Sequence, residues 1–125
     1  MRNYSTTPDQ TVWEAWRELV NMTSRELESF LRSEEGREAG LSPSQARSLG
    51  IKSGQESARW ILRMKPLGRS YAQAERNWTP TMWSWARRQN AFIRRMLGNR
   101  GPLIRDGEAT RKLTSLLVWG HDPYK

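Results

Sequence analysis

The chain has 125 residues, enough for one domain with a buried core, and 36% of them are hydrophobic. It has no cysteine and a single histidine, His121, which excludes disulfides, thiolate metal sites, cysteine nucleophiles and any chemistry that needs two imidazoles. Seven tryptophans argue against full disorder, and we find neither a membrane-spanning run nor a signal peptide. We therefore expect a single cytoplasmic domain, residues 1–125.

Four helix-start signals divide the first half of the chain. Each has a Ser or Thr that can cap a helix and a Glu or Gln three residues later, and two of them place a proline at the first helical position. Apolar residues at helical spacing follow three of the signals, and we expect Gly36, Gly50 and Pro66 to end helices. The signals are Thr7–Gln10, Thr23–Glu26, Ser42–Gln45 and Ser53–Glu56.

The second half begins with an expected linker, residues 66–78, with one helical turn around Tyr71–Glu75. Thr79 and Pro80 then open the longest helix, residues 80–97. We expect a loop at Asn99–Asp106 and a last helix at about 108–119, and strand signals are nearly absent. The sequence therefore predicts an all-α fold, a compact orthogonal array of about five to six short helices.

The charges are distributed unevenly along the chain. Residues 1–62 carry 8 basic and 9 acidic side chains, whereas residues 63–125 carry 13 basic and 4 acidic ones. This gives an acidic-to-neutral half, 1–62, and a basic half, 79–125, on either side of the linker. Between Arg76 and Arg105 there are seven arginines and no acidic residue. Such a stretch indicates an anionic partner, most often nucleic acid, unless the first half neutralises it within the fold.

The long helix carries the first group of candidate binding residues. On a helical wheel, Arg87 and Arg94 lie on one flank and Arg88 and Arg95 on the other, with small residues between them. Small residues between cations let a helix approach a phosphate backbone closely. Alternatively, these arginines extend around a core helix and pair with glutamates of the first half. Arg100, Arg105, Arg111 and Lys112 would extend the same basic surface.

Lys52 is a separate candidate, in the turn Ser48–Gly54 between two expected helices. A helix N-terminus binds phosphate readily, so Lys52 could contact a nucleic-acid backbone there. The spacing of a Walker A loop is missing and no strand precedes the turn, which excludes a nucleotide hydrolase of that type. A simple connection between two helices is the alternative interpretation.

The segment Trp119–Pro123 places His121 next to Asp122. Metal phosphohydrolases need further histidines, which are absent, so we predict no catalytic residue, no metal and no cofactor. We expect Gly120 to end a helix, Trp119 to pack back onto the fold, and His121 or Asp122 to cap a nearby helix terminus. A small hydrolase that uses His121 is a third, weaker alternative.

Three segments carry a resemblance to a known family. Met22–Glu28, Leu49–Gly54 and Trp119–Pro123 resemble segments of a family of small bacterial proteins of unknown function that carry a DNA-binding label. The order of the segments and the near-terminal place of the last one agree with the family, whereas Ile51 stands where the family has a histidine. The resemblance implies DNA binding, and such a basic, compact protein would also suit a bacteriophage accessory or virion protein.

Together these features predict a non-enzymatic nucleic-acid-binding protein that contacts phosphates through an arginine-rich helical face, with DNA as the favoured partner and no membrane partner. It would be cytoplasmic, in association with the nucleoid or within a virion. The alternative is a virion or phage accessory protein, or an interaction module that binds an acidic protein.

Overall fold

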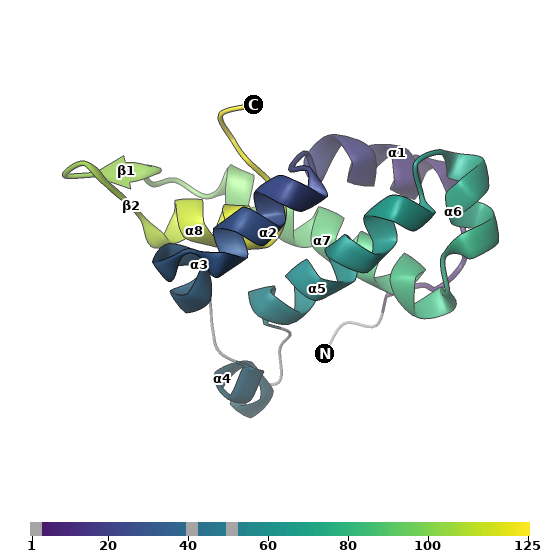
Figure 1. Ribbon diagram of the computed structural model, residues 1–125, viewed down its shortest axis with the longest axis horizontal. Coiled ribbons are helices and arrows are strands. Elements are labelled where there is room, and N and C mark those ends of the chain that lie inside the picture. Colours follow the sequence, from purple (N-terminus) through teal and green to yellow (C-terminus); the bar gives the residue numbers. More distant parts are fainter. Residues whose placement is uncertain (1–3, 40–42, 50–52) are drawn as a thin grey trace.

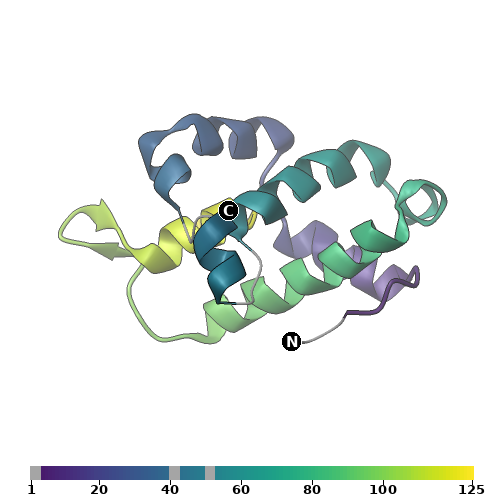
Figure 2. The same ribbon diagram turned by 90° about the horizontal axis from the view of Figure 1, so that it is seen from below.

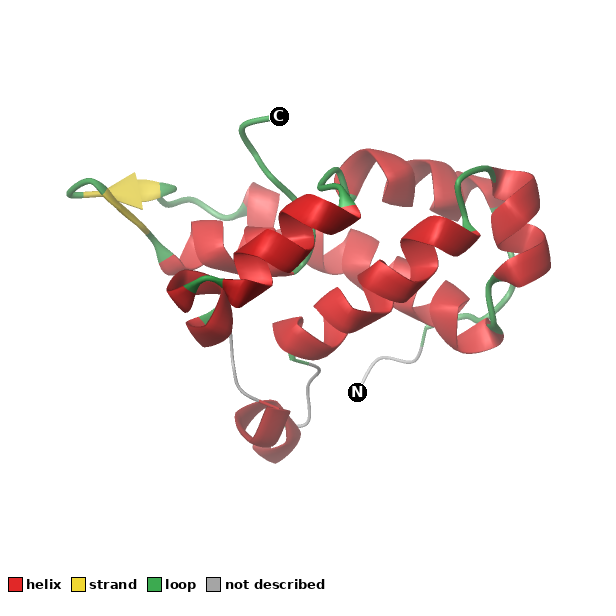
Figure 3. Cartoon of the chain, viewed as in Figure 1, coloured by secondary structure: helices red, strands yellow, loops and turns green. Residues whose placement is uncertain are grey.

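The computed structural model describes residues 4–39, 43–49 and 53–125. These residues form eight α-helices, one short 3₁₀ helix (η1) and one β-hairpin (Figures 1 and 3). The predicted all-α class is confirmed, with more and shorter helices than the five or six expected. The elements are α1 (Gln10–Leu19), α2 (Ser24–Arg32), α3 (Glu34–Glu38), α4 (Pro43–Ser48), α5 (Gly54–Met64), η1 (Lys65–Leu67), α6 (Tyr71–Asn77), α7 (Pro80–Gly98), β1 (Ile104–Arg105), β2 (Glu108–Ala109) and α8 (Arg111–Val118).

Side-chain caps set most of the helix starts. Thr23 forms a complete capping box with Glu26 at the start of α2, and the hydroxyls of Ser53 and Thr79 cap α5 and α7. The first predicted box is wrong in detail, because Asp9 rather than Thr7 caps α1 and accepts from the backbone N–H groups of residues 11 and 12. Ser42 and Gly50, two other expected boundary residues, lie outside the described residues.

Two stretches of the chain are more ordered than expected. The helix that Gly36 was expected to end already ends at Arg32, and Ser33 caps an additional helix, α3, which contains Gly36. Residues 66–78 are not a linker, because η1 and α6 fill them and both pack into the fold. Trp78 at their end is 5% exposed, and its Nε1 donates to the Met64 carbonyl at 3.0 Å. A buried indole with a satisfied N–H explains why this segment folds onto the body.

The core is built around α7, which runs along much of the molecule with α1 and α5 packed against it (Figure 2). Trp78 packs edge-on against Trp16 and Trp83, with ring centroids 4.9 and 4.8 Å away. Gln89 of α7 is fully buried among them and accepts a hydrogen bond from Trp16 Nε1 at 2.7 Å. Its own amide donates to the hydroxyl of Ser57 on α5 at 3.2 Å, so this buried polar group ties three helices together.

A β-hairpin replaces part of the loop and of the last helix that we expected. Asp106 and Gly107 have φ angles of 53° and 79°, and the strands pair antiparallel on either side of them. Positive φ at both central residues is typical of the tight turns that match strand twist, and Asp-Gly is a preferred pair for them. The hairpin projects from one end of the helical body (Figure 1), and α8 begins only after it, at Arg111.

Candidate nucleic-acid interface

The arginines of α7 form two adjacent pairs, Arg87 with Arg88 and Arg94 with Arg95, and the two pairs have different surroundings. Arg94 and Arg95, in the last turns of the helix, are exposed, whereas Arg87 and Arg88 are half-buried. The Arg87 guanidinium donates to the carbonyls of Ser5 and Thr7, both at 2.7 Å. The first pair therefore holds the N-terminal segment, and only the second pair is open to a partner.

Arg88 contributes to the same attachment through aromatic rings. Its guanidinium carbon lies 4.7 Å from the centroid of Tyr4 and 5.5 Å from that of Trp85. A cation over a ring face is attracted by the ring quadrupole. Tyr4 thus covers Arg88, and the carbonyls of Ser5 and Thr7 cover Arg87. The part of the predicted basic face that lies on the first half of α7 is therefore occupied by the N-terminal segment.

Lys112 connects the loop after α7 to the start of α8. Its Nζ donates to the carbonyl of Asn99 at 2.7 Å and approaches that of Gly101 at 3.4 Å. These bonds hold the loop against α8 and keep Arg100 close to the helix start. Lys112 therefore fixes the loop in place and also adds a positive charge to the surface.

Five further predicted cations form what we call the basic end. They lie on the end of α7, on the loop, on the hairpin and at the first position of α8, all at the end of the molecule that carries the hairpin (Figure 2). All are exposed, and the structure shows no ion pair for any of them with a described residue. The members of the basic end are Arg94, Arg95, Arg100, Arg105 and Arg111.

The acidic half does not neutralise these cations in the part of the chain that the structure describes. The ion pair found among the described residues joins Glu26 to Lys125 instead. Asp106 and Glu108, both on the hairpin, are the acidic residues nearest in sequence to the basic end. Residues 94–112 carry six basic and two acidic side chains, so this region has a net charge of +4.

Lys52 lies outside the described residues, and its neighbours have structural roles. Ser53 is 2% exposed and accepts from the backbone N–H of Glu56 at 3.0 Å. A Cβ on Gly54 would lie 2.6 Å from Val118 Cγ1 and 3.1 Å from Trp119 Nε1, so only glycine fits there without movement. This side of the turn is thus fixed by helix capping and by contact with α8.

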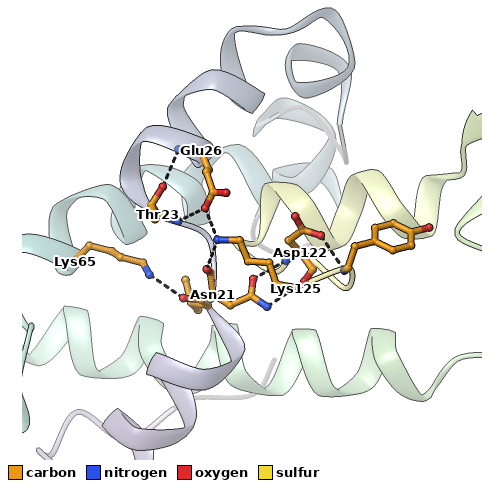
Figure 4. A network of polar contacts seen from close by, with 8 residues as sticks. Asn21, Thr23, Glu26, Lys65, Asp122 and Lys125 are labelled. Carbon is orange, nitrogen blue, oxygen red and sulfur yellow. Dashed lines mark hydrogen bonds and ion pairs between the residues drawn. The ribbon is translucent and has the colours of Figure 1, made fainter.

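The C-terminal segment packs as we expected. Gly120 has a φ of 88° and ends α8, Trp119 is 5% exposed, and His121 Nδ1 lies 2.6 Å from the Leu19 carbonyl at the end of α1. Asn21 and Asp122 exchange two further hydrogen bonds, at 2.7 and 3.0 Å (Figure 4). His121 and Asp122 therefore have a structural role: their hydrogen bonds hold the C-terminal segment against the end of α1.

Described residues from all three segments that carry the family resemblance meet where the C-terminal segment packs against the end of α1, a contact that we call the joint. The backbone N–H of Met22 donates to the Gly120 carbonyl at 3.2 Å, and Gly54 lies against the end of α8. The Lys125 ammonium bonds to the Asn21 carbonyl and to Glu26, whose pKa falls to about 2 mainly because of that ammonium (Figure 4). Packing and capping thus account for the described residues that meet here, whereas Leu49 in the second motif is 64% exposed.

The hairpin is the part of the candidate interface that sequence reasoning missed. Its signal was available, because an Asp-Gly pair between short β-compatible segments predicts a tight hairpin turn. Ile104 on β1 is 46% exposed, and Arg105 follows it directly. Two-residue strands are too short to show the alternation by which strands are normally recognised.

The described residues show no other chemical centre at the basic end. They contain no group of three or more His, Asp or Glu side chains that could hold a metal ion. None of the helices in the described ranges combines the length and the apolarity that crossing a membrane requires. The candidate interface consists of exposed guanidinium groups and the hairpin.

Comparison with known proteins gave one match. Neither the curated proteins nor the solved structures that were searched include a match to this chain. A family model described as "Protein of unknown function (DUF3140)" matches residues 15–116, a range that runs from α1 into α8 and includes the whole basic end. Because the matched range covers most of the chain, the protein belongs to this family of unknown function.

Proposed function

We propose that the protein binds nucleic acid, with DNA as the favoured partner, through phosphate contacts made by the basic end. The observation that carries this proposal is the set of five exposed guanidinium groups without an ion-pair partner among the described residues. A guanidinium presents paired donors that match phosphate oxygens, and clustered cations gain further from the release of condensed counterions. The resemblance of the three sequence segments implies the same partner, whereas the family model that matches the chain is described only as of unknown function.

The hairpin suggests how the contact is made. A two-stranded ribbon can enter a groove of the duplex, and here it carries Arg105 on one strand. The carboxylate of Asp106 lies at the turn, where it would repel a phosphate. Phosphate contacts are therefore expected from Arg100 and Arg111 at the base of the hairpin and from Arg105 at the end of β1, with the Asp106 carboxylate pointing away from the backbone.

An acidic protein is the second candidate partner, and it too has a specific observation in its favour. The basic end exposes Leu97 and Ile104, with 43% and 46% of their surfaces accessible. Apolar side chains among cations suit a protein interface, whose centre is depleted in charge. A virion or accessory role would fit this form of binding, whereas a place in the cytoplasm with the nucleoid fits the first.

The deciding experiment compares two charge-matched double variants. Arg105→Ala with Arg111→Ala removes two members of the basic end, and Arg59→Ala with Arg76→Ala removes two exposed arginines of α5 and α6. Binding to labelled random-sequence duplex and single strands is measured by anisotropy at several salt concentrations. We expect the first variant to lower the salt slope by about two units and to weaken all sequences alike.

Two results would contradict the proposal. Equal losses in the two double variants would mean that net charge, and not the basic end, governs binding. Weak binding of the wild type even at low salt, together with binding of an acidic polypeptide that depends on Leu97 and Ile104, would favour the protein partner.

A further inference from the structure

A hollow of about 900 Å³ lies where the end of α1, the start of α2 and the junction of α5 with η1 come together. None of its lining residues belongs to the basic end. Three positively charged residues, Arg17, Lys65 and Arg69, and one negatively charged residue, Glu28, line the hollow. Two helices, α1 and η1, and the loop after η1 therefore place three cations around one space, with a single carboxylate among them.

These cations lack the partners that usually accompany clustered charges. No ion pair joins Arg17, Lys65 or Arg69 to a carboxylate of the described residues. Arg17 lies 5.8 Å from the ring centroid of Trp13, a contact that leaves its hydrogen-bonding edge free. Like charges in one hollow repel each other, and an anion bound between them would relieve that repulsion.

Lys65 is the best-placed donor. Its ammonium donates to the Val20 carbonyl at 2.8 Å (Figure 4) and lies 5.5 Å from the ring centroid of Trp16. An ammonium has three N–H donors, and this is its one hydrogen bond to a described residue. Burial, followed by the nearby Arg17 and Lys125, lowers the pKa of Lys65 to about 8. A bound anion would favour the charged form.

The rest of the lining indicates the size and type of ligand. Ser24, at the first position of α2, adds a hydroxyl and a helix N-terminal N–H group, which suit phosphate oxygens, whereas the Thr23 hydroxyl and N–H are already engaged in the capping box with Glu26. Leu62 and Pro66 add apolar surface. The hollow thus offers a polar, cationic side and an apolar side, the usual combination in sites for small organic ligands.

We propose that this hollow binds a small organic phosphate monoester, with the phosphate held by Lys65, Arg69 and Arg17 and the organic group on the apolar side. Glu28 disfavours polyphosphates, since it adds negative charge to the same space. The site is independent of the proposed nucleic-acid interface. A phosphate could also come from a nucleic-acid backbone, and the experiment separates the two sources.

The test follows backbone amide signals by NMR during titration with three probes: phenyl phosphate, inorganic phosphate and a short DNA duplex. We expect phenyl phosphate to shift the signals of residues 17–24 and 62–69 saturably, with an affinity about tenfold above that of inorganic phosphate. Lys65→Gln, which keeps a donor for the Val20 carbonyl, and Arg69→Gln should each weaken binding by about tenfold. Arg76→Gln is the matched control.

Three outcomes would overturn the proposal. The first is no saturable shift with phenyl phosphate at millimolar concentration. The second is equal affinity for inorganic phosphate, which would remove the organic group from the assignment. The third is a response to the DNA duplex alone, which would assign the hollow to a nucleic-acid backbone. If Lys65→Gln unfolds, the exposed Arg69 and Arg17 supply the same comparison.

Discussion

Each half of α7 carries two adjacent arginines, and the two pairs have opposite environments. In the first half, Arg87 and Arg88 hold the N-terminal segment while Gln89 ties α1 and α5 to the helix from its buried side. In the second half, Arg94 and Arg95 face solvent. The pairs are seven residues apart, so helical geometry alone makes them equivalent. Contacts from distant segments therefore decide which cations remain free for a partner.

The largest effect is expected for the buried side of the first half. Gln89→Leu keeps the size of the side chain but leaves the Trp16 indole N–H without its acceptor and removes the donor to Ser57. Each buried polar group left without a partner costs about 1–3 kcal/mol, so we expect a loss of about 2–4 kcal/mol in the free energy of unfolding. Urea denaturation measures it, with Arg94→Ala as an unchanged control. A loss below about 1 kcal/mol would mean that Gln89 is not the tie between these helices.

The comparison between the two arginine pairs is tested directly by two double variants. Arg87→Ala with Arg88→Ala should lower the free energy of unfolding by about 1 kcal/mol, because charge-assisted bonds and ring contacts at a half-exposed site are lost. It should free the N-terminal segment to proteolysis and leave the salt slope of DNA binding unchanged.

Arg94→Ala with Arg95→Ala should give the reverse pattern. The free energy of unfolding should stay within about 0.5 kcal/mol of the wild type, because both side chains are exposed. The salt slope should fall by about two units if both arginines contact phosphate. Identical behaviour of the two double variants in both measurements would show that the halves of α7 do not differ in role.

The hairpin allows a smaller and more local test of the basic end. Gly107 has a φ of 79°, where a Cβ costs about 1–2 kcal/mol, so Gly107→Ala should loosen the hairpin and weaken DNA binding without changing global unfolding. Asp106→Asn is its charge control, since asparagine tolerates positive φ and removes the carboxylate. We expect it to strengthen binding a few-fold. Weaker binding by Asp106→Asn would place the turn itself in the contact.

Local signals in the sequence were sufficient for the starts of α2, α5 and α7 and insufficient for the interface. Capping side chains such as Thr23, Ser53 and Thr79 act within four residues, and the structure places each where the sequence predicts it. The exposure of an arginine depends on what covers it from elsewhere in the chain. Nothing near Arg87 in the sequence indicates that carbonyls some 80 residues away accept its hydrogen bonds.

The misplaced elements have equally specific causes. Asp9 is a stronger capping residue than Thr7, and the Thr7 carbonyl instead accepts a hydrogen bond from Arg87. The segment 66–78 has a weak helical pattern of its own and becomes ordered because Trp78 is buried against Trp16 and Trp83. Tertiary burial therefore overrides local preference in this second case.

The smallest effect concerns the joint at the chain end, which contrasts with the basic end because its cation is paired. Lys125 lowers the pKa of the Glu26 carboxyl from its ordinary 4.5 to about 2, with help from the Thr23 N–H. A carboxyl whose pKa is lower in the folded state stabilises the fold above about pH 4.5, and this contribution is lost as the pH falls toward 2.

The melting temperature of the wild type should therefore exceed that of Glu26→Gln slightly at neutral pH, and the difference should vanish in acid. Thermal melts at a series of pH values measure this, with Glu28→Gln as a control on the same helix. A difference that persists unchanged down to the lowest pH would mean that the ion pair contributes nothing and that Glu26 acts only as a neutral hydrogen-bond acceptor in the capping box.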